Sequence, residues 1–194
     1  MTVATSLVHA DLRALPGVLD RKALQPVLEA VAQASRASGH SLALLTLDLD
    51  HFKGFQDEHG PARAEQVLTQ LAMLLQQLQP SSASLAYLGA DEFVLILPDT
   101  GLPAAAALAE RLRERIAGAL AQLGGQPPLS ATLGVAASPA NQDWDASTLL
   151  ALADMRMTFA KRRLTPHHNL VWAGTLPSDW YIRLEIDPAS WPSQ

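Results

Sequence analysis

Acidic side chains stand at two points of the sequence where their spacing could bring them together. Asp48 and Asp50 close an apolar segment, and Asp91 and Glu92 lie between two short apolar runs. Residues two apart on a strand share a face, so Asp48 and Asp50 can point the same way. If the two segments are neighbouring strands, three or four carboxylates converge at one edge of a sheet. The alternative is that these acids, at a strand end and in a turn, hydrogen-bond backbone groups.

Carboxylates that converge at the edge of a sheet form a suitable binding site for a hard divalent cation. Mg²⁺ binds through one or two carboxylates and completes its coordination with water and phosphate oxygens. Such a cation neutralises the charge that develops during phosphoryl or nucleotidyl transfer. The acidic residues therefore predict metal-assisted chemistry on a phosphorylated substrate.

The surrounding sequence supplies the elements that would position these acids. Apolar residues at helical spacing predict four helices, and short apolar runs bounded by turn residues predict five strands. The helices cover residues 19–38, 64–78, 103–123 and 146–163, and the strands cover residues 41–49, 84–88, 92–97, 129–137 and 169–173. The second and third strands form a hairpin over a three-residue connection. The order contains a βαββαβ core, which predicts an α+β, ferredoxin-like fold whose antiparallel-rich sheet carries helices on one face.

The last part of the chain, residues 174–194, does not fit that core and is predicted to extend a domain that spans residues 1–173. Trp180, Ile182, Leu184 and Ile186 occupy alternate positions, which is typical of an amphipathic strand. This strand could dock on the domain as an extra edge strand. It could instead present a surface for a homodimer or a partner protein, because exposed edge strands pair readily.

Composition excludes several classes of protein. The 194 residues carry 14 basic and 19 acidic side chains, and a net charge of −5 argues against a broad binding surface for DNA or RNA. The chain has no cysteine, which excludes disulfide scaffolds, thiolate zinc sites and cysteine nucleophiles. No apolar run approaches the ~20 residues of a membrane span, and the first residues lack the pattern of a signal peptide. We therefore expect a globular domain in the cytoplasm that binds neither a nucleic-acid polymer nor a membrane.

Five segments of the chain resemble the catalytic domain of diguanylate cyclases, the GGDEF family. They read LPGVLDRKAL, LDLDHFKGFQDEHG, YLGADEFVLILP, LSATLGVA and ALADMRMTFAKRR, and they span roughly residues 13–173 in the family's order. The resemblance implies a palm-type, ferredoxin-like sheet. It also implies that two facing protomers condense two GTP molecules into cyclic di-GMP, with Mg²⁺ or Mn²⁺ as the cofactor.

Several residues match the family's functional positions. The resemblance implies that Asp48 and Asp91 bind the metal and that Asp91 also activates the 3′-hydroxyl. Glu92 matches the fourth signature position and is again acidic. Lys53 and Lys161 match the family's two phosphate-binding lysines. All five side chains keep the family's charge.

The implied nucleotide site also includes residues that contact the phosphates and the base. The backbone of His51 and Phe52 would approach the phosphates. Gln56 stands where the family has an asparagine that reads guanine, and Glu65 where it has an aspartate with the same role. Each side chain is one methylene longer, and the loss of one buried base hydrogen bond costs ~1–3 kcal/mol. The two longer side chains could remove guanine selectivity or could re-form it together.

The signature turn departs from the family as well, because Gly89 is followed by Ala90 and not by a second glycine. Both residues belong to the implied substrate-binding turn. If position 90 needs a positive φ, alanine costs ~1–2 kcal/mol there or reshapes the loop. Thr165 stands in place of a phosphate-binding arginine, and residues 80–83 lack the charges of the family's product-inhibition site.

Three interpretations of function remain open at this point. The first is a degenerate nucleotide-binding or protein-interaction module of cyclic di-GMP signalling, with weak or no cyclase activity, which accounts for the departures around base and phosphate. The second is an active diguanylate cyclase, because the acids and both lysines remain. The third is an enzyme that uses another nucleotide. The adjacent His167 and His168 could be metal ligands, but a histidine pair before a strand without matched partners is more typical of a loop.

Overall fold

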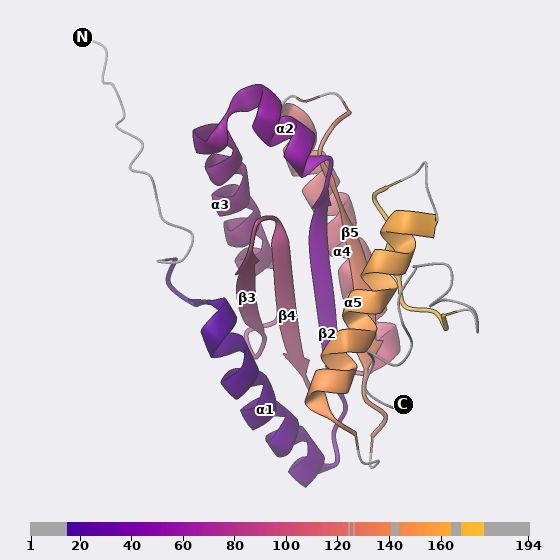
Figure 1. Cartoon of the computed structure of the whole chain (residues 1–194). Helices are drawn as coiled ribbons and strands as arrows, with labels where there is room; N and C mark the ends of the chain where they lie inside the picture. The colour runs from indigo at the N-terminus through magenta and orange to yellow at the C-terminus, as the bar shows by residue number, and fades with distance from the viewer. Residues whose placement is uncertain (1–14, 124, 126, 141–143, 164–167, 177–194) are drawn as a thin grey trace.

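The computed structural model describes residues 15–123, 125, 127–140, 144–163 and 168–176 of the chain. Within these residues a six-stranded sheet packs against helices (Figure 1). No helix of the described part is both long and apolar enough to cross a bilayer. The elements are, in chain order, β1 (Val18–Leu19), α1 (Arg21–Ser38), β2 (Leu42–Asp50), α2 (Phe52–His59), α3 (Pro61–Leu78), β3 (Ser84–Gly89), β4 (Glu92–Pro98), α4 (Leu102–Leu120), the 3-10 turn η2 (Ala121–Leu123), β5 (Ser130–Ala137), α5 (Ala146–Arg163) and β6 (Val171–Trp172).

The sheet has the strand order β1-β3-β4-β2-β5-β6. The three central pairings are antiparallel, whereas the two-residue strands β1 and β6 add in parallel at the edges. Strands β2, β3, β4 and β5, with α3 and α4 between them, form the predicted ferredoxin-like βαββαβ core. The register pairs Asp48 of β2 with Glu92 of β4, so acids from two distant segments meet at one end of the sheet.

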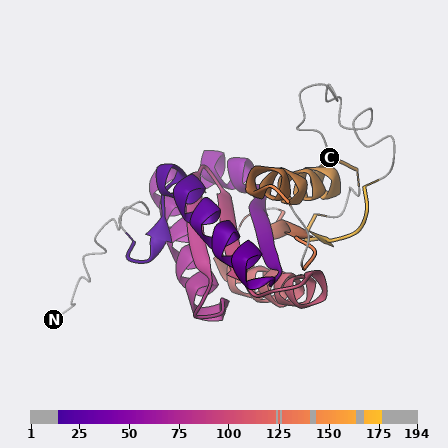
Figure 2. The ribbon, with the colours of Figure 1, turned by 90° about the horizontal axis from the view of Figure 1, so that it is seen from below.

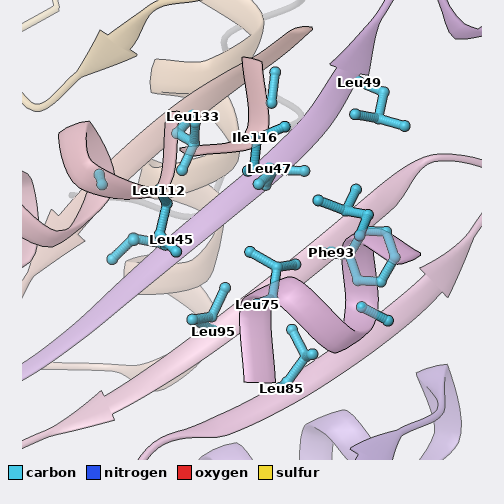
Figure 3. Close-up of a cluster of buried hydrophobic side chains, with 14 of the residues drawn as sticks. Leu45, Leu47, Leu49, Leu75, Leu85, Phe93, Leu95, Leu112, Ile116 and Leu133 are labelled. Carbon is cyan, nitrogen blue, oxygen red and sulfur yellow. The ribbon is translucent and has the colours of Figure 1, made fainter. Parts of the chain in front are cut away.

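Both faces of the sheet are covered, because alternate residues of the central strands belong to different clusters of buried side chains. On one face, Leu45 and Phe93 belong to the same cluster as Leu75 of α3 and Leu112 of α4 (Figure 3). On the other face, Leu44 belongs to the cluster that contains residues of α1 and α5. Figure 2 shows α4 and α5 on opposite sides of the sheet. The expected placement of helices on one face therefore holds for the two core helices, and α1 and α5 cover the opposite face.

The predicted elements are present with shifted ends, and two further elements were not predicted. Helix α5 covers the predicted residues, and α3 begins three residues early, at Pro61. The hairpin connection consists of Ala90 and Asp91 alone, because Gly89 still pairs with Glu92. The short strand β1 and the helix α2 were missed, and the last predicted strand is reduced to β6. The strand predicted within the extension lies outside the described residues.

Helix α5 approaches the sheet closely at Gly134 of β5. A Cβ atom at this position would lie 2.9 Å from Cβ of Met157 and closer still to the carbonyl oxygen of Ala153. The contact therefore requires a residue without a side chain. Because β5 pairs with β2, it also brings the last turn of α5, which carries Lys161, beside the end of β2.

Candidate functional site

Four charged residues that the sequence analysis singled out meet at one end of the sheet, and we call Asp48, Asp91, Glu92 and Lys161 the acidic edge. Asp48 lies near the end of β2, directly opposite Glu92, which opens β4. Asp91 is the last residue of the β3–β4 connection, and Lys161 comes from the last turn of α5. Figure 1 shows the end of β2, the β3–β4 turn and the last turn of α5 at the same end of the sheet.

The carboxyl groups of Asp48 and Asp91 are in direct contact, and this contact changes the acidity of Asp91. Burial raises the pKa of Asp91 to about 7, and the negative charge of Asp48 and a hydrogen bond between the two carboxyls act in the same direction. The ammonium group of Lys161 opposes them. A divalent cation beside the pair would reverse the effect, because it favours the ionised form of both groups.

The donor set fits Mg²⁺ or Mn²⁺. These hard cations prefer oxygen ligands, and Asp48 and Asp91 offer carboxylate oxygens that already touch. Within the described residues, no group of three or more histidine or acidic side chains is arranged to hold a metal ion. The protein would therefore supply two carboxylates, and water and the phosphates of a nucleotide would complete the coordination.

Lys161 is the counter-ion of the acidic edge. Its ammonium group donates hydrogen bonds to Asp48 and, at 3.1 Å, to the carbonyl oxygen of Leu49. It also lies 3.7 Å from Oδ1 of Asp50. Three contacts to the end of β2 thus hold Lys161 next to the carboxylates at which the phosphates of a nucleotide would arrive.

Asp50 shares the face of Asp48, as predicted, but it does not belong to the acidic edge. Its side chain is fully buried and accepts hydrogen bonds from Oγ of Ser130 at 2.7 Å and from Oγ1 of Thr132 at 2.9 Å. The backbone N–H of Asn169 donates a third, at 2.8 Å. Asp50 therefore ties β2 to β5 and to the segment after α5, and three carboxylates converge at the edge instead of four.

His168 lies beside this buried carboxylate, whereas its sequence context favoured a loop position without a site. Its Nδ1 atom is 3.5 Å from Oδ1 of Asp50, and its ring meets the ring of His51 edge-on, with centroids 4.5 Å apart. Burial lowers the pKa of His51, and His168 and Lys161 add to this, whereas Asp50 opposes it. No spacing rule in the sequence points to His168. Thr165 and His167 lie outside the described residues.

A cavity of about 420 Å³ adjoins the acidic edge, and we call it the base pocket after the base contacts expected of Gln56 and Glu65. Its wall brings together most of the residues to which the sequence assigned nucleotide contacts. The lining residues are Phe52, Lys53, Gln56, Pro61, Ala64, Glu65, Leu68, Tyr87, Ala90 and Asp91. Because Asp91 belongs both to this wall and to the acidic edge, the two regions are continuous.

The β3–β4 turn forms one rim of the base pocket. Gly89 has φ +105° and Ala90 has φ +53°, so position 90 does require a positive φ. An alanine in this region is strained by ~1–2 kcal/mol. The hydroxyl of Tyr87 donates a hydrogen bond to the carbonyl oxygen of Ala90 at 3.1 Å. Lys53, another residue of the wall, is exposed and donates to Oδ1 of Asp57 at 2.7 Å.

Two further charged residues, Arg21 and Asp154, lie near the acidic edge and were not singled out from the sequence. Arg21 donates to the carbonyl oxygen of Leu88 at 3.0 Å and lies 3.6 Å from Glu92, so it joins α1 to both strands of the hairpin. Burial raises the pKa of the Asp154 carboxyl, although the residue as a whole is exposed, and the charges of Glu92 and Asp48 add to the effect. Asp154 stands seven residues before Lys161 on α5, a spacing that puts both on one face of a helix. That spacing is the signal that could have found it.

Comparison with known proteins identifies relatives along most of the chain. The family described as "Diguanylate cyclase, GGDEF domain" matches residues 10–165. An uncharacterized signaling protein of Caulobacter vibrioides is 38% identical over 154 residues, which are 78% of this chain and 19% of that protein. The diguanylate cyclase DgcP of Pseudomonas aeruginosa is 34% identical over 149 residues, which are 76% of this chain and 22% of that protein. The chain thus spans less than a quarter of either relative.

A solved structure shows the same fold. The active GGEEF domain of a diguanylate cyclase from Vibrio cholerae superposes with a TM-score of 0.72 at 24% sequence identity. The superposition covers 80% of this chain and 96% of that domain. At this level of identity the likeness concerns the fold alone.

Proposed function

The chain belongs to the GGDEF family of diguanylate-cyclase-type domains, which act in cyclic di-GMP signalling, and on that premise we propose that it binds GTP together with Mg²⁺ or Mn²⁺ and condenses it weakly or not at all. One observation carries the proposal: the base pocket, with Gln56 and Glu65 in its wall, opens directly onto Asp91 of the acidic edge. A base and a metal-bound phosphate chain can therefore be held at the same time.

The chemistry of the base pocket favours guanine over adenine. The carboxylate of Glu65 can accept hydrogen bonds from N1–H and from the amino group of guanine, and the amide of Gln56 can donate to its O6. Adenine has a lone pair at N1, which a carboxylate does not bind. The extra methylene of each side chain moves these contacts and weakens them without exchanging donors for acceptors. We therefore propose that guanine is still preferred, at reduced affinity.

The acidic edge keeps the groups that the reaction requires. A Mg²⁺ or Mn²⁺ ion held by Asp48 and Asp91 would neutralise charge on the phosphates. Asp91 would accept the proton of the 3′-hydroxyl of one GTP, and that oxygen would form a bond to the α-phosphorus of a second GTP as pyrophosphate leaves. A carboxylate suits this role because its oxygens can accept the proton within hydrogen-bond distance. Lys161 would stabilise the phosphate chain beside Asp48.

Several features argue for slow turnover. The Cβ of Ala90 lies on the rim of the base pocket, and its backbone is strained. The longer Gln56 and Glu65 displace the base, and a displacement of about 1 Å at the reacting atoms can cost ~100-fold in rate. Thr165 cannot replace the two-pronged phosphate contact of an arginine. Each departure lowers the rate, and the nucleotide still binds at reduced affinity.

A turnover assay tests this proposal against active cyclisation and against the use of another nucleotide. Concentrated protein is incubated with Mn²⁺ or Mg²⁺ and either GTP or ATP, and the products are separated by chromatography. We expect a trace of cyclic di-GMP at most, formed from GTP alone, absent in Asp91→Asn and increasing more than linearly with protein concentration because two protomers must meet. Rapid formation of cyclic di-GMP would establish an active cyclase. A product formed from ATP and not from GTP would establish another nucleotide as the substrate.

The proposed condensation also requires a surface at which two protein molecules meet. Because each condensation needs two facing protomers, we propose that the extension, residues 174–194, supports a homodimer or contact with a partner protein. Removal of the residues after Ala173 should then give a species of lower mass by light scattering. An unchanged mass would reject a role of the extension in self-association.

A further inference from the structure

We propose that Tyr87 is a positioning residue, which holds the strained turn at Ala90 and through it fixes the carboxyl of Asp91. The inference extends the nucleotide site proposed above and rests on it for its consequence in binding. Its structural part, the coupling of Tyr87 to the turn, stands on the geometry of the hairpin alone.

The turn needs an external restraint because of the residue that it contains. Ala90 has φ +53°, a region that side chains with a Cβ rarely adopt, and it occupies the first position of a connection of only two residues. Relaxation of Ala90 toward negative φ would rotate the peptide group that joins it to Asp91. Since the carboxyl of Asp91 must meet Asp48, such a rotation would separate the acids of the edge.

Tyr87 supplies that restraint from the preceding strand. Its hydroxyl donates a hydrogen bond to the carbonyl oxygen of Ala90 at 3.1 Å, which is the oxygen of the peptide group that joins Ala90 to Asp91. A rotation of this group would break the hydrogen bond. The bond therefore stabilises the left-handed conformation specifically and not the hairpin in general.

The phenol ring is itself held in place. It lies at a tilt against Phe93 of β4, with ring centroids 5.0 Å apart, and Phe93 is fully buried. The strand pairing between β3 and β4 is irregular between Tyr87 and Gly89, just where the side chain leaves the strand. Because the ring is anchored, the hydroxyl loses little freedom when it bonds to Ala90.

The same side chain also forms part of the base pocket. Tyr87, Ala90 and Asp91 line one cavity with Gln56 and Glu65, so a bound base would lie against the turn that Tyr87 holds. A change at Tyr87 should therefore alter nucleotide binding through the turn. A glycine at position 90 would adopt the positive φ without strain and would make the restraint unnecessary.

A double-mutant cycle tests whether the effect of the Tyr87 hydroxyl on nucleotide binding depends on the residue at position 90. The four proteins are the native chain, Tyr87→Phe, Ala90→Gly and the double variant, and Tyr87→Phe keeps the ring against Phe93 while it removes the hydroxyl. Binding of a non-hydrolysable GTP analogue with Mg²⁺ is measured by calorimetry. We expect Tyr87→Phe to weaken binding ~3–10-fold when residue 90 is alanine, the effect of one hydrogen bond, and less than about twofold when it is glycine.

A second measurement separates this inference from the proposed function. The backbone amide resonance of Asp91 is recorded for the four proteins without nucleotide. Tyr87→Phe should displace it more in the Ala90 background than in the Ala90→Gly background. Equal displacements and equal losses of affinity in both backgrounds would overturn the positioning role. If the native chain binds no GTP analogue, the proposed function fails, and the amide resonances alone decide whether Tyr87 holds the turn.

Discussion

The acidic edge and the base pocket adjoin each other, yet they differ in how they are built. The edge is carried by the sheet: Asp48 and Glu92 face each other across two paired strands, and Lys161 comes from a helix packed on them. The wall of the pocket comes largely from α2, α3 and the β3–β4 turn. By the resemblance to the family, the residues of the edge match the expected types, whereas Gln56, Glu65 and Ala90 depart from them.

The difference shows where this fold allows change. A charged group of the edge touches several others, and the buried Asp50 beside them satisfies donors from β5 and from the segment after α5. Replacement of Asp50 leaves buried donors without an acceptor, and replacement of Asp48 or Lys161 leaves a partly buried charge without its partner. Gln56 and Glu65 line a cavity of about 420 Å³, so an added methylene at either position has more room than in the packed core. We therefore expect changes beneath the edge to affect folding, and changes of Gln56 and Glu65 in the pocket to affect binding alone.

The largest expected effect comes from the glycine that brings α5 against the sheet. Gly134→Ala would place a Cβ against the backbone of α5, so we expect the free energy of unfolding to fall by ~3 kcal/mol or more. Gly118→Ala is the matched control, since a Cβ on that exposed glycine of α4 meets nothing within 4 Å and should stabilise the protein by ~0.5–1 kcal/mol. Urea unfolding measures both. Equal effects of the two substitutions would contradict the close approach of α5.

The buried carboxylate beneath the edge should have the next largest effect. Asp50→Ala leaves Ser130, Thr132 and the N–H of Asn169 without their acceptor, and we expect a loss of ~2–4 kcal/mol in the free energy of unfolding. Asp57→Ala removes an exposed carboxylate that pairs with Lys53 on the same helix and should cost no more than ~0.5 kcal/mol. Chemical denaturation compares the two. A small loss for Asp50→Ala would show that the edge tolerates change as the pocket does.

The stability of the edge should also depend on pH in a defined direction. Asp91 has a pKa of about 7 in the folded protein and 3.8 as its ordinary value, so between these values the folded state holds a proton that the unfolded chain has lost. The free energy of unfolding should therefore fall as the pH rises from about 4 to 7, with a slope approaching ~1.4 kcal/mol per pH unit from this group. Asp91→Asn should remove that contribution. Unfolding curves without divalent cations, recorded across this range, measure it, and an unchanged slope in the variant would contradict the assignment.

The smallest effects should come from the base pocket and should leave stability unchanged. Gln56→Asn combined with Glu65→Asp shortens both side chains by the added methylene, and we expect affinity for a GTP analogue to rise ~3–10-fold. Affinity for the ATP analogue should not rise, which provides the control. Calorimetry measures both ligands, and thermal unfolding checks the fold. A large change in stability would mean that the pocket is as constrained as the edge.

The sequence predicted the sheet well because its central strands are continuous apolar runs. Leu42 to Leu47 are buried on both faces of β2, a pattern that differs clearly from that of an amphipathic helix. Helix α2 was missed because it has only eight residues and a largely polar sequence. It also begins after His51, which has φ +63° and makes no side-chain capping bond. Start signals of the usual kind were therefore absent.

The candidate site was predictable in part. The spacing of Asp48 and Asp50 predicted that both lie on one face of the strand. It could not show that the Asp50 carboxylate accepts hydrogen bonds from β5 and from Asn169 and is therefore not available to the site. The position of His168 depends on the path of the chain after α5, which local patterns do not encode. The conditional expectation at Ala90 was confirmed by its positive φ, whereas the contact from Tyr87 required the three-dimensional course of the hairpin.

The edge and the pocket should act as one nucleotide site, and a single calorimetric comparison tests whether they do. A non-hydrolysable GTP analogue is titrated with Mg²⁺ into the native chain, Asp48→Ala and Glu65→Ala, and with EDTA into the native chain. We expect the native protein to bind the analogue only with Mg²⁺, and both variants to bind it at least ~5-fold more weakly. Binding to Asp48→Ala should no longer depend on Mg²⁺, whereas binding to Glu65→Ala should still depend on it. No binding to the native protein, or binding that is indifferent to both substitutions, would contradict the claim.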